Sequence, residues 1–168
     1  IASLVKCGYK VDTSVTPHIT WNDITREYPV AYTNAPEQPY WTDKETFPMS
    51  STNKSLLEIP VSIINFPSVY FSEVLKSGFG LRRKMNSNIT LWLRPKFSDL
   101  TDLKKIVDYY RKTYKGETII VINMMFHNVE VLPGLSPYNK TQNDCNEYMD
   151  SLASFFEFCN FNKINSVQ

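Results

Sequence analysis

The side chain best placed to do chemistry is His127, which follows directly on an apolar run from Thr118 to Phe126. That run is rich in β-branched residues and is bounded by Gly116 before it and by Pro133 and Gly134 after it, a pattern typical of a strand buried on both faces. An imidazole at the end of such a strand stands where α/β sheets and barrels place ligands and catalytic groups. The alternative is that the ring only caps the strand with a hydrogen bond. The long loop that follows favours a site.

Asp12 and Arg94 are the charged candidates at the ends of other predicted strands. Asp12 lies in a short strand from Tyr9 to Val15, where its carboxylate either caps the next turn or stands beside a catalytic partner, and the residues alone favour the cap. Arg94 ends a strand that begins at Asn88. Because right-handed crossovers bring the ends of parallel strands to one sheet edge, we expect Arg94 and His127 at the same edge.

Aromatic residues make up 14% of the chain, and many of them lie outside periodic segments. Rings in loops suit stacking on sugars, but they also cover hydrophobic cores, and the sequence leaves both readings open. The region from Thr16 to Ser55 has no periodicity and mixes prolines with aromatics, which predicts an ordered surface excursion. The candidate substrate-binding residues are Trp41, Trp92, Arg94 and Tyr138.

The remaining elements frame these residues in one predicted domain, residues 1–168. A strand with Pro60 at an edge or bulge is expected at Leu56–Ile64, and a short helix is expected at Phe66–Phe79. Amphipathic helices are expected at Leu100–Tyr114, capped by Ser98 or Asp99, and at about Gln142–Cys159. Strands alternating with helices predict an α/β fold with a mainly parallel sheet.

Composition and motifs narrow the function. The net charge of +1 gives no electrostatic argument for nucleic acid or an acidic membrane, and no apolar stretch is long enough to span a bilayer. The three cysteines form no CxxC pair, which indicates buried thiols in a reducing compartment, so we expect a cytoplasmic protein. No GxGxxG, P-loop, GxSxG or HExxH motif is present, and the chain's own motifs offer no metal site.

Five ordered segments resemble the bacterial polysaccharide deacetylases of the NodB-homology type, most closely the branch found with surface-glycan biosynthesis. The resemblance covers nearly the whole chain and matches the C-terminal half of that domain. It implies a partial (β/α) barrel of the distorted seven-stranded deacetylase type, with mainly parallel strands and a long aromatic and proline-rich loop. The segments are GYKVDTSVTPHITW (8–21), NAPEQPYW (34–41), LLEIPVSI (56–63), LWLRPKF (91–97) and MMFHNVEVLPGLSPY (124–138).

The resemblance also implies roles for two residues. In that family an aspartate and two histidines hold the metal and a neighbouring aspartate is the base, and this sequence carries none of those motifs. His127 matches the late histidine that acts as general acid to the leaving amine, and Asp12 resembles the acidic residue that tunes it, since a nearby carboxylate raises the pKa of an imidazole. Asn128 stands where relatives often carry serine.

Two functions follow as expectations. The first is the C-terminal portion of a carbohydrate de-N-acetylase of bacterial surface polysaccharide metabolism, acting on an N-acetylated oligo- or polysaccharide. It would use a divalent metal, zinc by resemblance, and would be inactive unless the metal-binding half is supplied. The second is a non-catalytic glycan-binding or structural half-barrel. Because Ile1–Cys7 reads as the tail of an amphipathic helix, we expect the chain to start inside a longer domain, and therefore to self-associate or to pair with a missing N-terminal segment.

Overall fold

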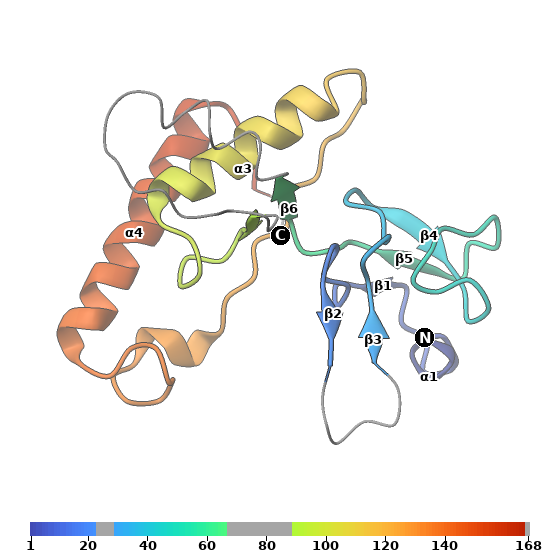
Figure 1. Ribbon diagram of the computed structural model, residues 1–168, viewed down its shortest axis with the longest axis horizontal. Coiled ribbons are helices and arrows are strands. Elements are labelled where there is room, and N and C mark those ends of the chain that lie inside the picture. The colour runs from blue at the N-terminus through green and yellow to red at the C-terminus, as the bar shows by residue number, and fades with distance from the viewer. Residues whose placement is uncertain (23–28, 67–88, 167–168) are drawn as a thin grey trace, which may run out of the picture.

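The computed structural model describes residues 1–22, 29–66 and 89–166, and its fold is mixed α/β (Figure 1). Figure 1 shows the strands β1 to β5 on one side of the molecule and the helices α3 and α4 with β6 on the other. The elements are α1 (Ala2–Lys6), β1 (Val11–Asp12), β2 (Thr20–Trp21), β3 (Val30–Ala31), β4 (Tyr40–Thr42), β5 (Leu56–Glu58), β6 (Ile63–Phe66), β7 (Ile89–Trp92), α3 (Leu100–Thr113), the 3-10 helix η2 (Asn128–Val131) and α4 (Gln142–Phe161).

The sheets of the described residues are small and mostly antiparallel. One sheet has the strand order β1-β5-β4, with β1 parallel and β4 antiparallel to β5, and the others are the antiparallel pairs β2-β3 and β6-β7. The prediction of a mainly parallel (β/α) barrel is therefore wrong. One cause lies at Pro60, which has no N–H to give to a ladder and separates β5 from β6 where a single strand was predicted.

The two long helices confirm the sequence-based prediction. Asp99 caps α3 by accepting a hydrogen bond from the N–H of Asp102. Thr141 and Asp144 form a reciprocal capping box at the start of α4. Each helix buries one stripe, which α3 makes from Leu103, Ile106, Val107 and Tyr110, and α4 from Cys145, Tyr148, Leu152 and Phe155. The helix predicted at Phe66–Phe79 lies, apart from Phe66, outside the described residues.

The main hydrophobic core lies between the β6-β7 pair and the two long helices. Ile64 from β6 and Leu93 after β7 contribute from the sheet side, and Phe155 contributes from α4. The stripe of α3 completes the cluster. Burial of this apolar surface is the main term that stabilises the helical half of the chain. In the described part of the chain no helix is long and apolar enough to cross a membrane.

The segment from Thr118 to Phe126 belongs to no sheet of the described residues, so that prediction is wrong. It is not buried on both faces either, since Ile119 is 75% exposed. The reason is that side chains, and not a neighbouring strand, form part of the hydrogen bonds to the backbone of this segment. Val121 donates its N–H to Gln38 Oε1 at 2.9 Å and accepts from Gln38 Nε2 at 3.0 Å.

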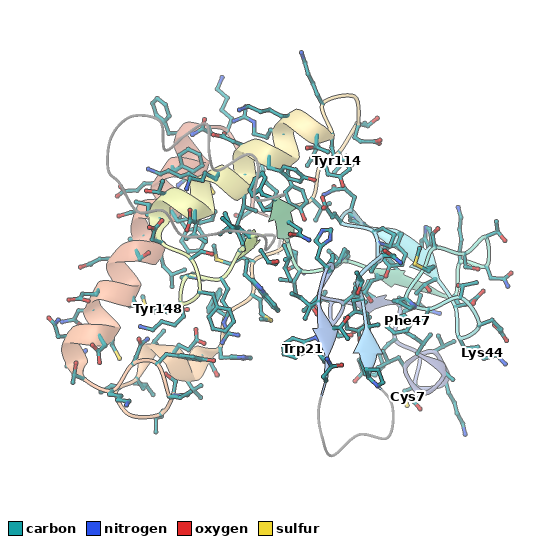
Figure 2. All side chains as sticks on the ribbon, in the orientation of Figure 1. Cys7, Trp21, Lys44, Phe47, Tyr114 and Tyr148 are labelled. Atoms are coloured by element: carbon teal, nitrogen blue, oxygen red, sulfur yellow. The ribbon has the colours of Figure 1, made fainter. Side chains whose placement is uncertain are left out.

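The residue next to Gln38 ties the N-terminal strands to α3. Glu37 Oε1 lies 2.8 Å from His18 Nε2, and its other oxygen accepts a 2.9 Å hydrogen bond from the Tyr114 hydroxyl. Tyr109 also donates to Glu37, at 3.4 Å. Figure 2 places Tyr114 just past the end of α3 that approaches the N-terminal strands. Glu37 and Gln38 together therefore join the two sides of the molecule.

Candidate functional site

Four aromatic rings from separate parts of the chain form a continuous row, called here the aromatic row: Trp21, Trp92, Phe97 and Tyr138. Neighbouring rings meet edge to face, with centroid separations of 6.1 Å for Trp21–Trp92, 5.8 Å for Trp92–Phe97 and 5.8 Å for Phe97–Tyr138. Trp21 lies on the side of β2 toward the helical half (Figure 2). Three of the rings remain exposed, so the row offers apolar ring surface to solvent.

Arg94 supports this row from beneath. Its guanidinium carbon lies 4.2 Å from the centroid of the Phe97 ring and 5.3 Å from that of Tyr138, at cation–π distance. The side chain itself is buried, and its Nη2 donates to Glu130 Oε1 at 2.7 Å. Arg94 therefore positions the two rings and is not itself an exposed sugar ligand.

Glu130 is the site residue that sequence reasoning missed. It is fully buried in η2, accepts from the Tyr148 hydroxyl at 2.9 Å, and its backbone carbonyl accepts from Asn139 Nδ2 at 2.6 Å. Burial acts to raise the pKa of Glu130, but the hydrogen bonds from Arg94 and Tyr148 outweigh it and lower that pKa, so the group is ionised at neutral pH. The signal in the sequence that could have pointed to this residue is a carboxylate flanked by Val129 and Val131.

His127 begins the turn that Glu130 anchors. Its carbonyl accepts the N–H of Glu130 at 2.9 Å, and its own side chain is exposed. The imidazole makes no hydrogen bond with any described residue, so within this part of the chain neither ring nitrogen is engaged. The buried Arg94–Glu130 pair thus holds the backbone that presents the ring.

Asp12 does not meet His127 in the described structure. Its carboxylate accepts from the N–H of Thr13 at 2.9 Å and from the hydroxyl of Ser14 at 2.8 Å, which is the capping role that the residues alone favoured. The pairing implied by the family resemblance is therefore not formed by a hydrogen bond. The reason is local, because both carboxylate oxygens are used by the turn that follows β1.

Asp12 instead lies opposite Glu58, its register partner on β5. Glu58 is fully buried, accepts from the N–H of Val15 at 3.1 Å, and has one oxygen without a hydrogen-bond partner among the described residues. Burial, with a smaller contribution from the charge of Asp12, raises the pKa of Glu58 to about 7. Sequence reasoning missed this residue because LLEIP reads as part of an apolar strand.

The four predicted substrate-binding residues separate into two groups. Trp92, Arg94 and Tyr138 come together in and under the aromatic row. Trp41 does not join them, since it lies on β4, on the face opposite to the buried Tyr40 and Thr42, and its ring contacts no other aromatic ring of the described chain. Figure 1 shows β4 far from α4, at the other side of the molecule.

The described residues do not fit the metal centre that the family resemblance implies. Within residues 1–22, 29–66 and 89–166, no group of three or more His, Cys, Asp or Glu side chains could hold a metal ion. Comparison with protein-family models, with curated proteins and with solved structures finds no match to this chain. The site is therefore interpreted from its own geometry.

Proposed function

We propose that this chain acts on N-acetylated carbohydrate as the sugar-binding and proton-donating portion of a polysaccharide de-N-acetylase. The observation that carries the proposal is the exposed aromatic row, two of whose rings are held, together with the turn of His127, by the buried Arg94–Glu130 pair. Arg94 touches the rings of Phe97 and Tyr138 and, through Glu130, fixes the turn that begins at His127.

The aromatic row suits a pyranose chain because the C–H faces of sugars pack on aromatic faces. Rings that meet edge to face leave their own faces turned in different directions, so successive sugar units can each find an apolar surface. The hydrogen bonds and ring contacts of Arg94 hold these rings before a ligand arrives, which lowers the entropy lost on binding.

His127 is the residue proposed to move a proton. When the carbon–nitrogen bond of an N-acetyl group breaks, the electron pair stays on the nitrogen, which must gain a proton to leave as an amine. A protonated imidazole with no hydrogen bond to the described residues can give that proton to the leaving nitrogen. The role is that of a general acid, and it requires no movement of the buried anchor.

The test is isothermal titration calorimetry of the purified chain with hexameric N-acetylchito-oligosaccharide. The fully de-N-acetylated hexamer is titrated as a second ligand. We expect Trp92→Ala to weaken binding of the N-acetylated hexamer roughly tenfold. Trp41→Ala is the control, because it removes a tryptophan that is exposed and lies outside the row, and it should bind like the unsubstituted chain. Equal losses in both variants, or no binding by the unsubstituted chain, would contradict the proposal.

A second function, a glycan-binding module without catalysis, is favoured by the lack of a metal-ligating group among the described residues. Acetate release measured on the same samples, with zinc added, separates the two functions. Release that disappears in His127→Ala assigns the chain a part in hydrolysis. Binding without release assigns it a binding role on its own, which is the result we expect in the absence of other polypeptide.

A further inference from the structure

Along the segment from Ile120 to Met125, hydrogen bonds to described residues lie on one edge only, and the other edge is open within the described part of the chain. Val121 bonds to Gln38, Asn123 donates its N–H to Ser62 Oγ and accepts from the N–H of Ser62, and Met125 donates to the Leu93 carbonyl. These are alternate residues. In an extended chain, alternate residues direct their peptide groups to the same edge.

The residues between them direct their peptide groups to the opposite edge. The N–H and C=O groups of Ile120, Ile122 and Met124 make no hydrogen bond to any residue that the structure describes. Their side chains nevertheless pack against the core cluster under α3 and α4, so the segment is fixed in place. The segment thus has the one-sided hydrogen-bond pattern of an edge strand, although on its bonded side it meets Gln38, Ser62 and Leu93 and not a single partner strand.

The open edge borders a groove that runs along the segment. Its cavity of about 860 Å³ is lined by residues 117–123 on one wall and by residues 162–166 on another. A smaller cavity of about 410 Å³ continues past Ile122 and Met124. Exposed Ile119 stands beside the groove, so the apolar character of the segment reaches solvent at this point.

We infer that this edge pairs with the same edge of a second copy of the chain. In an antiparallel pair about a two-fold axis at Val121, Ile120 of each copy lies opposite Ile122 of the other. The peptide groups of both residues have no hydrogen-bond partner among the described residues, so each facing pair can exchange both hydrogen bonds.

A second copy is the partner that this edge fits because the edge is complementary to itself. Isoleucine meets isoleucine across the pair, and β-branched cross-strand neighbours are among the more stabilising ones. The groove carries charges of both signs, the cations Arg111 and Lys163 and the anion Glu117. A two-fold contact also closes, giving a dimer and not a fibre.

The test combines oligomeric state with hydrogen exchange on the whole chain. Sedimentation velocity across a concentration series should show a monomer–dimer equilibrium. Ile119→Lys should weaken it roughly tenfold, because each copy then places a charge beside the shared edge. Leu135→Lys is the matched control, because Leu135 is also an exposed aliphatic residue but lies outside the groove. This variant should leave the dimer unchanged.

Amide exchange identifies the edge even where a variant fails to fold. In the unsubstituted chain, the amides of Ile120 and Ile122 should be protected at high concentration and lose that protection on dilution. The amides of Val121 and Asn123, which are bonded within the chain, should stay protected at every concentration. A monomer at all concentrations, or a dimer in which Ile120 and Ile122 exchange freely, would overturn the inference.

Discussion

Two glutamates of this chain are equally buried, but their pKa values are shifted in opposite directions. Glu58 in the β1-β5-β4 sheet faces another carboxylate and has its pKa raised to about 7. Glu130, in the turn between Phe126 and α4, meets Arg94 and Tyr148 and has its pKa lowered. Burial acts on both in the same sense, so the partner decides the charge. The sheet therefore holds a carboxyl group poised to lose its proton near neutral pH, while the helical half holds a fixed ion pair.

The largest effect should come from removing the cation of the helical half. Arg94→Met leaves Glu130 charged and buried without its partner, and we expect a loss of about 4 kcal/mol in the free energy of unfolding, measured by urea denaturation. The double variant Arg94→Met/Glu130→Gln should recover part of that loss, since no unpaired charge remains. If the single variant lost less than about 1 kcal/mol, the pair would not be a buried ion pair.

The next effect concerns the pH dependence of stability that Glu58 creates. The pKa of Glu58 is about 7 in the folded chain against an ordinary 4.5, so between these values the folded state binds a proton that the unfolded state does not. Its contribution is thus fully present below about pH 4.5 and lost as the pH rises to about 7, a change on the order of 3 kcal/mol.

Glu58→Gln should flatten this part of the stability profile while keeping an acceptor for the N–H of Val15. Chemical denaturation at half-unit pH steps measures the change. Glu130 gives the opposite slope, because its lowered pKa stabilises the fold above its ordinary value and that stability is lost as the pH falls. A variant profile that still declined toward pH 7 would remove Glu58 as the cause.

The smallest effect compares one tyrosine from each region. Tyr148 donates to the ionised Glu130, whereas Tyr40, beside Glu58 in the sheet, donates to the neutral carbonyl of Pro48 at 2.6 Å. Hydrogen bonds to charged groups are the stronger, so Tyr148→Phe should cost about 2 kcal/mol and Tyr40→Phe about 1 kcal/mol, by thermal or urea denaturation. Equal costs would mean that Glu130 carries less charge than its partners indicate.

The sequence predicted what depends on near neighbours and missed what depends on distant ones. The helices α3 and α4 were predictable because their apolar stripes and caps repeat within a few residues. The apolar run at Thr118–Phe126 looked like a buried strand, but strand pairing is decided elsewhere in the chain, and here Gln38 holds one edge.

The candidate site divides in the same way. Strand-end reasoning placed Arg94 and His127 at one edge of a parallel sheet, which the described residues do not form; instead the Arg94 side chain meets Glu130 in the turn that begins at His127. The sequence offered a signal for Glu130, a lone charge between valines, but that signal does not reveal which cation the carboxylate meets. Trp41 was grouped with Trp92 on ring chemistry, and only the register of β4 shows that it belongs to another surface.

The contacts of Glu37 and Gln38 set an order in which the chain can assemble. Gln38 meets a residue 83 positions later, and Glu37 meets Tyr114 77 positions later. Closing such long loops costs entropy before any contact is gained, whereas α3 and α4 form from local turns. We therefore expect the helical half to become structured first. The N-terminal strands are synthesised earlier, but they can form their final contacts only after residue 121 is in place.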